Sequence, residues 1–310
     1  MNVLSLFDGC SCGRVALERA GIKVDKYWAS EVDKYAIQVS KKNWPDIEHI
    51  GDVCGVDATG MDVDLLIGGS PCQGFSFAGK QLNFDDPRSK LFFEYVRILK
   101  ECKPKWFLLE NVKMKKESQD VISEALGVEP VEVNSALVSA QNRKRLYWTN
   151  IPFDMPEDRG IVLKDVLESG SADRDKSYCL DANYYKGGSL KNYLEKKRRK
   201  LVMAQSEKRL MVCEQVGEAS EIKGHDFLRR VYSIDGKCPT LTAICGGNQE
   251  RKISEDGKTW RKLTPIECER LQTLPDNYTE GVSNTQRYKM IGNGWTVDVI
   301  AHILKGIEND

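Results

Sequence analysis

The chain has 310 residues, of which 41% are hydrophobic and 30% are charged, as is usual for a globular protein. Lys plus Arg and Asp plus Glu number 46 each, so the global charge neither supports nor excludes a nucleic-acid partner, and any basic binding face must be local. No run of about 18 apolar residues is present, which excludes an obvious membrane span. The length allows one large domain and a smaller one.

The cysteines and histidines do not follow a metal-binding pattern. None of the ten cysteines forms a CxxC pair, and the three histidines lie far apart in the sequence. We therefore expect no metal site. Scattered free thiols fit a reducing, cytoplasmic setting, and the first residues lack the basic segment of a signal peptide.

The first 150 residues alternate between predicted strands and helices. Strands are expected at 2–7, 26–30, 47–50, 65–67, 105–109, 131–138 and 146–149, and helices at 14–20, 33–42, 91–100 and 119–126. This alternation predicts an α/β fold with a doubly wound, mostly parallel sheet. Later, Thr264-Pro265 begins a helix over 263–272, and an apolar helix runs to about residue 307.

Cys72 follows the most apolar of these strands after a turn at Gly68-Gly69. Ligands of open α/β sheets bind beyond the carboxyl ends of the strands, so Cys72 is placed like a nucleophile. The alternative is a small buried structural cysteine. The polar stretch 77–88 has no hydrophobic period, which predicts a long loop that acts as a lid.

The other strand ends carry glycines and acids that suit a nucleotide-like cofactor. A glycine-bearing loop at 8–13 joins the first strand to the first helix. Glu31 ends the second strand and suits a ribose diol, although an acid near a helix N-terminus is an alternative. Asp52 ends the third strand and can accept from an adenine amine or cap a helix.

A basic stretch follows a change of composition near residue 165. Residues 186–210 hold nine basic residues against two acidic ones, with an unbroken basic run over 196–200. Phosphate contact is our preferred interpretation. A solvated helix face and a nuclear-import patch are the alternatives.

Together, the motifs resemble those of the DNA cytosine-5 methyltransferase family, in the family's order and along nearly the whole chain. The matching stretches are 7–13 (Phe-Asp-Gly-Cys-Ser-Cys-Gly), 69–73 (Gly-Ser-Pro-Cys-Gln), 110–112 (Glu-Asn-Val), 141–145 (Gln-Asn-Arg-Lys-Arg), 261–270 and 292–295 (Gly-Asn-Gly-Trp). Three positions depart from the family pattern, one of them Gly294, since Gly-Asn-Ser is commoner than Gly-Asn-Gly in the last motif. Cys12 replaces a glycine, and Val32 stands where many members have Trp.

The resemblance implies an S-adenosylmethionine-dependent methyltransferase fold that acts on double-stranded DNA as a monomer, without membrane or metal. It implies a catalytic and cofactor domain at 1–165, a smaller, mostly β or irregular target-recognition domain at 166–259, and a return to the first domain at 260–310. The implied catalytic residues are Cys72, Glu110, Asn111, Arg143 and Arg145. The implied cofactor residues are Phe7, Asp8, Gly9, Gly13, Glu31, Val32, Asp52, Leu91 and Asn293. The expected DNA-contacting residues are Gln73, Ser76, Lys80, Arg88, Lys196, Lys197, Arg198, Arg199, Thr240 and Leu241.

The residue types suggest how such a site works. The Cys72 thiolate adds to C6 of a flipped-out cytosine, so that C5 attacks the sulfonium methyl group and S-adenosylhomocysteine is left. Glu110 holds N3, and Arg143 binds O2. We expect an ordered water near Asn111, or a backbone oxygen, to remove the C5 proton.

Two alternatives remain open in the sequence. One branch of the family acts on tRNA, but Gly74 after Pro-Cys-Gln and the full-sized recognition region favour DNA. The second alternative is a catalytically silent DNA-binding relative. The intact Cys72, Glu110 and Arg143 argue against it.

Overall fold

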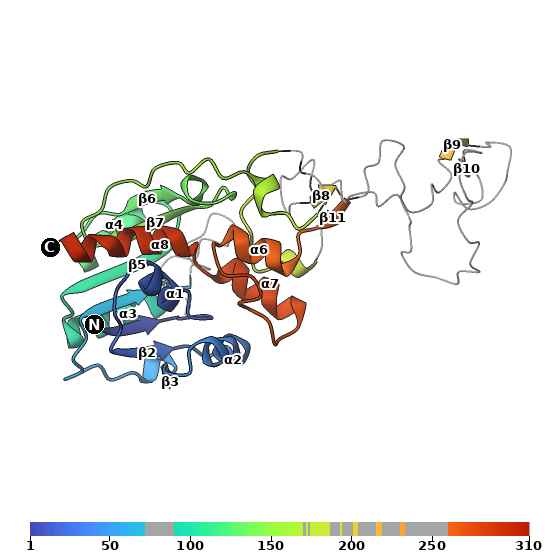
Figure 1. Cartoon of the computed structure of the whole chain (residues 1–310). Coiled ribbons are helices and arrows are strands. Elements are labelled where there is room, and N and C mark those ends of the chain that lie inside the picture. Colours follow the sequence, from blue (N-terminus) through green and yellow to red (C-terminus); the bar gives the residue numbers. More distant parts are fainter. Residues whose placement is uncertain are drawn as a thin grey trace.

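The computed structural model describes residues 1–71, 90–169, 172, 174–186, 193, 201–203, 215–218, 230–232 and 260–309. Its centre is a seven-stranded sheet with the strand order β3-β2-β1-β4-β5-β7-β6 (Figure 1). The strands are β1 (Asn2–Leu6), β2 (Lys26–Ser30), β3 (Glu48–Gly51), β4 (Leu65–Gly68), β5 (Trp106–Val112), β6 (Val131–Asn134) and β7 (Lys144–Thr149). Neighbours from β3 to β5 pair in parallel, and β7 is antiparallel to both β5 and β6. The prediction of a mostly parallel α/β sheet is confirmed.

Helices cover both faces of this sheet. One face is covered by α1 (Cys12–Arg19), α2 (Lys34–Asn43) and α8 (Val297–Leu304), and the other by α3 (Lys90–Cys102) and α4 (Lys116–Leu126). Two further helices, α6 (Pro265–Leu271) and α7 (Asn284–Asn293), pack in a separate core. Short 3-10 helices include η1 (Val53–Gly55), η3 (Ser135–Leu137), η4 (Leu163–Val166), η5 (Tyr184–Lys186) and η7 (Lys305–Asn309). Among the residues that the structure describes, no helix is long and apolar enough to cross a membrane.

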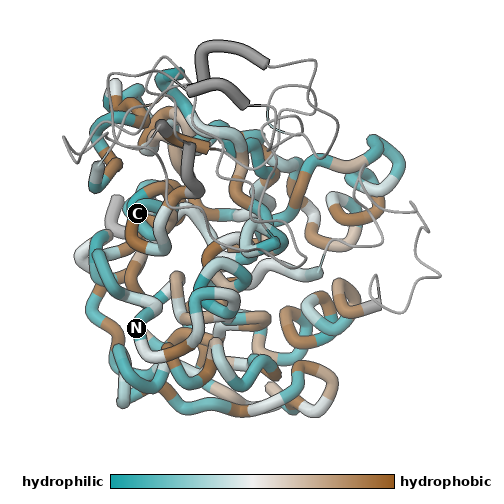
Figure 2. Tube along the Cα trace, turned by 90° about the vertical axis from the view of Figure 1, so that its right-hand side faces the viewer, coloured by the Kyte–Doolittle hydropathy of each residue, from teal (hydrophilic) through white to brown (hydrophobic). Residues whose placement is uncertain are grey.

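Successive side chains of β1 enter different layers because a strand alternates its faces. Val3 packs into a core shared with α1, α2 and α8, whereas Leu4 packs into a second core with α3 and α4. The helices in Figure 2 accordingly change between brown and teal along their length, as expected when one side is buried and the other is solvated. The result is three layers, with the sheet between two layers of helices.

The C-terminal helix α8 lies beside α1, although almost the whole chain separates them (Figure 1). Asp298 of α8 joins this contact by an ion pair with Arg19, with 2.7 Å between Oδ1 and Nη1. Its second carboxylate oxygen lies 2.5 Å from Nη1 of Arg159. The last described segment is therefore held on the same layer as the first helix.

A third, smaller core surrounds α6 and α7. Leu271 of α6 and Ile291 of α7 pack there with Leu163, Val166 and Tyr184. Two small antiparallel pairs involve the region expected to recognise the target. They are β8 (Leu201–Met203) with β11 (Trp260–Lys262), and β9 (Gln215–Glu218) with β10 (Arg230–Tyr232). One of these strands, β11, lies just beyond that region. The domain boundaries at 165 and 259 stay predictions, since much of the intervening chain lies outside the described residues.

Three local expectations need correction. The strand expected over 131–138 ends at Asn134, because the Asn134 side chain accepts from the amide of Ala136 and begins η3. Strand β5 continues past Leu109 through Glu110 to Val112, since β7 extends the pairing. Helix α7 is not predicted by the sequence pattern at all. By contrast, Thr264 caps α6 as expected and forms a capping box with Glu267.

A buried carboxylate ties α6 to α7. Glu269 is fully buried, and its Oε1 lies 2.9 Å from Nη2 of Arg287. The amides of Asn277 and Thr279 donate to the same carboxylate at 2.7 and 2.8 Å. Every partner of this charge is therefore a hydrogen-bond donor inside the protein.

We expect Glu269→Ala to lower the free energy of unfolding by about 3–5 kcal/mol, because it leaves Arg287 buried without its counter-charge. The matched control is Asp276→Ala, which removes the partly exposed ion pair with Arg270 and should cost less than about 1 kcal/mol. Urea unfolding followed by circular dichroism measures both values. Equal losses in the two variants would contradict the role given to Glu269.

Candidate active site

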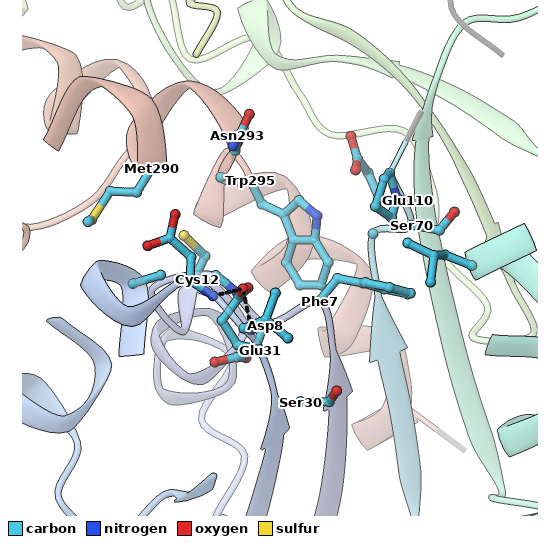
Figure 3. Close-up of a pocket in the computed structure, with 18 of the residues that line it drawn as sticks. Phe7, Asp8, Cys12, Ser30, Glu31, Ser70, Glu110, Met290, Asn293 and Trp295 are labelled. Atoms are coloured by element: carbon cyan, nitrogen blue, oxygen red, sulfur yellow. Dashed lines mark hydrogen bonds between the residues drawn. The ribbon is translucent and has the colours of Figure 1, made fainter. Parts of the chain in front are cut away.

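A cavity of about 500 Å³ opens at the carboxyl edge of the sheet. This volume is typical of small-molecule and cofactor sites, and the position is the usual one for ligands of open α/β sheets. Several residues singled out from the sequence line it. They are Phe7, Asp8, Gly9, Glu31, Val32, Asp52, Leu91, Glu110, Asn111, Arg143, Arg145 and Asn293. Figure 3 shows Phe7, Glu31, Glu110 and Asn293 arranged around this cavity.

Gly13 is the exception among the expected cofactor residues, since it does not line the cavity. A Cβ atom at this position would lie 2.5 Å from Cδ1 of Ile67 and 3.0 Å from the hydroxyl of Tyr27. The missing side chain therefore lets α1 pack closely on the sheet. Gly13 shapes the site by packing, not by lining it.

The loop after β1 is held in an unusual conformation. Phe7 and Ser11 have φ values of 57° and 64°, in the left-handed region that side chains rarely adopt. The amide of Gly9 donates to Oε2 of Glu31 at 2.8 Å, and the Tyr278 hydroxyl donates to the carbonyl of Cys10 at 2.8 Å. Such strained segments persist where surrounding contacts fix them, often at ligand sites.

Glu31 fits both interpretations of the sequence. Its Oε1 accepts from the amides of Val32 and Asp33 at 2.7 and 2.8 Å, just before α2 begins. Its Oε2 accepts one bond, from Gly9, and keeps acceptor capacity in the wall of the cavity. Asp52 is similar, because Oδ1 caps η1 through the amide of Cys54 at 3.0 Å while the residue also lines the cavity.

Asp8 is a buried carboxyl group in the same wall. It accepts from the hydroxyls of Ser11 and Tyr27 at 2.5 and 2.8 Å. Burial raises the pKa of Asp8 to about 6, and the two hydrogen bonds oppose this shift only in part. The cavity thus contains a carboxyl group that changes charge close to neutral pH.

The opposite side of the cavity contains an ion pair between two strands. Oε1 of Glu110 on β5 lies 2.9 Å from Nε of Arg145 on β7. Their strands pair Glu110 with Tyr147 and Val112 with Arg145, so Glu110 and Arg145 are diagonal neighbours on one face. The side chains are only 12% and 15% exposed, which strengthens this charge-assisted contact.

Arg143 lines the cavity, and its guanidinium is bound by backbone carbonyls. Its guanidinium donates to the carbonyls of Leu180, Gly292 and Gly294 at 3.0, 3.3 and 2.9 Å. The residue is 3% exposed. Arg143 therefore fastens the segment after α7 to the rest of the site, and Arg145 is the guanidinium that accompanies Glu110.

The segment after β4 brings the chain to the cavity just before Cys72. Ser70 and Pro71 line the wall, and Nδ2 of Asn111 donates to the Ser70 hydroxyl at 3.1 Å. A Cβ atom on Gly69 would lie 3.0 Å from Nε1 of Trp295 and 3.1 Å from Oε2 of Glu110. A side chain at this position would therefore crowd both Trp295 and Glu110, and the glycine lets them lie against the turn.

Some residues expected from the sequence lie outside the described part of the chain. They are Cys72, Gln73, Ser76, Lys80, Arg88, Lys196, Lys197, Arg198, Arg199, Thr240 and Leu241. The predicted lid at 77–88 and the basic run at 196–200 lie outside it as well.

Sequence reasoning singled out Asn293 and the motif at 292–295, but it missed the rest of the wall that α7 provides. Gln286, Lys289, Met290 and Trp295 line the cavity, and Nζ of Lys289 lies 2.7 Å from the Asp33 carboxylate. The residues of α7 are mostly polar and show no clear apolar stripe, so no local signal marks it. The large aromatic Trp295 inside a glycine-rich turn was the one available sign.

Comparison with known proteins gives consistent results. The family model described as C-5 cytosine-specific DNA methylase matches residues 1–309. The type II methyltransferase M1.ScrFI of Lactococcus lactis subsp. cremoris is 32% identical over 324 residues, covering 96% of this chain and 76% of that protein. The type II methyltransferase M.HhaI of Haemophilus parahaemolyticus is 30% identical over 330 residues, covering 99% and 94%.

Solved structures resemble the fold over its whole length. The Entamoeba histolytica methyltransferase EhMeth superposes with a TM-score of 0.69 at 17% identity, covering 100% of this chain and 98% of that one. The S. pombe Dnmt2 methyltransferase gives a TM-score of 0.63 at 16% identity, covering 100% and 99%. At these identities the likeness concerns the fold alone.

The raised pKa of Asp8 predicts a specific pH dependence of stability. The folded state takes up a proton near pH 6, whereas the unfolded state does so near pH 3.8. The stabilisation is therefore complete below about pH 4 and is lost as the pH rises through 6. Between pH 4 and 7.5, the wild type should lose up to about 3 kcal/mol relative to Asp8→Asn. Urea unfolding of both proteins at the two pH values measures this difference, and parallel pH profiles would refute it.

Proposed function

The chain belongs to the C-5 cytosine-specific DNA methylase family, and on that premise we propose that it methylates a flipped-out cytosine in double-stranded DNA through a covalent bond from Cys72. Its activity as a DNA cytosine-5 methyltransferase follows from the family and from its type II relatives. One observation carries the finer proposal. The Glu110–Arg145 ion pair lines the cavity that the chain enters at Ser70-Pro71, directly before Cys72.

The residues of the cavity suit S-adenosylmethionine. Phe7 and Leu91 offer apolar contact, and Glu31 and Asp52 keep acceptor oxygens for ribose hydroxyls and an adenine amine. Val32 is 69% exposed and lines the same wall, where it offers an adenine ring less contact than an aromatic side chain. When bound, S-adenosylmethionine supplies an electrophilic methyl group on a positively charged sulfur.

In this proposal, the base is activated by three side chains. The Cys72 thiolate forms a bond to C6, which makes C5 nucleophilic and places negative charge on N3 and O2. Glu110 hydrogen-bonds or protonates N3. Arg145, positioned by Glu110, donates to O2 and takes the role that the sequence suggested for Arg143.

Asn111 acts as a positioning residue here. Its amide nitrogen donates to Ser70 in the turn before Cys72, and its oxygen accepts from the amide of Val112 on its own strand at 2.8 Å, so the side chain joins that turn to the end of β5. The C5 proton is taken by an ordered water or a backbone oxygen, after which Cys72 is eliminated. A base stacked in a duplex cannot reach a cavity of this kind, which is why flipping belongs to the proposal.

DNA contact is assigned to three stretches of the chain. Residues 166–259 select the sequence, with Thr240 and Leu241 among them, and the basic run over 196–200 contacts phosphates. The loop at 73–90 closes over the target base. Residues 1–165 and 260–310 form the catalytic domain of a cytoplasmic monomer.

A covalent trapping experiment tests the reaction. DNA with 5-fluorocytosine cannot lose its C5 substituent as a proton, so wild-type protein with S-adenosylmethionine should form a complex stable to denaturant. Cys72→Ala should form none. A tRNA with 5-fluorocytosine serves as the control substrate and should trap far less protein. Methylation of ordinary DNA without any trapped complex would rule out the covalent route, and trapping on tRNA alone would rule out DNA as the substrate.

Substitution of Arg145 and of Arg143 should affect different properties of the protein, the rate of trapping and the stability of the fold. Arg145→Gln should bind S-adenosylhomocysteine like the wild type yet form the trapped complex at least about 100-fold more slowly, because it loses oxyanion stabilisation. Arg143→Gln should lower the free energy of unfolding by about 3 kcal/mol, because carbonyls in a buried region lose their donor. Trapping kinetics, calorimetric binding and urea unfolding separate the cases. A stable but chemically dead Arg143→Gln beside an active Arg145→Gln would reverse the assignment.

A further inference from the structure

Two thiols lie together behind the wall of the cavity, and no step above uses them. The sulfurs of Cys10 and Cys12 are 3.8 Å apart, and the residues are 1% and 3% exposed. Cys10 belongs to the strained loop after β1, and Cys12 begins helix α1 and also lines the cavity. The pair is therefore buried from bulk solvent and reached through the cavity.

We propose that Cys10 and Cys12 are an oxidation site, at which a peroxide forms a disulfide that weakens cofactor binding. This inference rests on the proposed function, since it takes the cavity to be the cofactor site. In the first step, the Cys12 thiolate attacks one oxygen of hydrogen peroxide; an S–O bond forms, the O–O bond breaks, and hydroxide leaves and is protonated to water. In the second step, the Cys10 thiol displaces hydroxide from the Cys12 sulfenic acid, and its proton completes a second water. Two thiols and one peroxide thus give one disulfide and two waters.

Cys12 is the first thiol to react, because it lines the cavity through which a peroxide enters and Cys10 does not. The hydrogen bond from Cys10 lowers the pKa of Cys12, burial opposes this shift, and the backbone amide of Trp295 lowers the pKa further. The same hydrogen bond, together with burial, raises the pKa of Cys10. A thiolate is the reactive form, and its neighbour is in place to resolve the sulfenic acid.

Closing the disulfide must move the two sulfur atoms, whose residues contact or adjoin groups in the cavity wall. A disulfide bond is about 2.05 Å long, so sulfurs now 3.8 Å apart must approach each other considerably. Cys12 would move away from the amide of Trp295, whose turn also carries Asn293. Cys10 follows Gly9, whose amide holds Glu31 at 2.8 Å. The oxidised loop therefore loses contacts that organise the cofactor wall.

The test measures cofactor binding, because Cys72 is itself expected to react with peroxide. In a Cys72→Ala background, the protein is treated with hydrogen peroxide, and mass spectrometry of peptides locates the loss of two hydrogens. We expect a bond between Cys10 and Cys12 and about tenfold weaker calorimetric binding of S-adenosylhomocysteine, reversed by dithiothreitol. Bound S-adenosylhomocysteine should slow the oxidation, because coupling between two sites is reciprocal.

Variants separate this pair from the other thiols. Cys10→Ala should keep its affinity after peroxide treatment, whereas Cys102→Ala, in helix α3, should lose affinity as the parent protein does. Absence of the Cys10–Cys12 bond, or unchanged affinity once it has formed, would overturn the inference while leaving the proposed function intact. A reduced parent protein that does not bind S-adenosylhomocysteine would instead overturn the cofactor assignment, and the inference with it.

Discussion

The antiparallel return of β7 beside β5 is the constraint on which the catalytic edge depends. In a parallel sheet, the amino ends of the strands lie at the edge opposite the ligand. Because β7 runs the other way, its first residues meet the carboxyl end of β5, and Arg145 lies opposite Val112. Glu110 and Arg145 then share one face by the two-residue period of the strands. A single reversed strand thus brings a cation to an edge that otherwise collects acids and amides.

Arg143, directly before β7, helps to close the far side of the cavity. Arg143 and Gln272 both donate to the carbonyl of Gly294, at 2.9 and 3.2 Å. Gln272 also accepts from the Thr296 hydroxyl at 2.8 Å, so the turn around Trp295 is held from both ends. Burying a guanidinium is costly unless its donors are satisfied, and here backbone carbonyls satisfy them. Two sides of the cavity are consequently positioned by Arg143 and Arg145, which are two residues apart in the sequence.

Local signals in the sequence were sufficient where the structure depends on neighbours in the chain. The strand at 26–30 and the Thr264 cap of α6 were predicted correctly because apolar content and capping chemistry act within a few residues. The two arginines were not distinguished, since Arg143 finds Gly292 and Gly294 about 150 residues away, and their spacing in the motif gives both the same face. Helix α7 was missed for a similar reason, because tertiary packing stabilises it and its own residues show no apolar period. Fold and motif positions were thus readable, whereas the division of roles within a motif was not.

The alternatives that the sequence left open for Glu31 turn out to be compatible. A carboxylate has about four acceptor sites, and Glu31 uses three for the amides of Gly9, Val32 and Asp33. One side chain therefore orders the loop after β1, caps the approach to α2 and still faces the cavity with an unused site. Because these hydrogen bonds already order the cavity wall, a ligand that binds there loses less free energy to ordering the loop. It also means that the order of the loop and the affinity for a ligand are coupled through Glu31, so a change that disturbs Gly9 or its neighbour Cys10 is transmitted to the ligand without touching it.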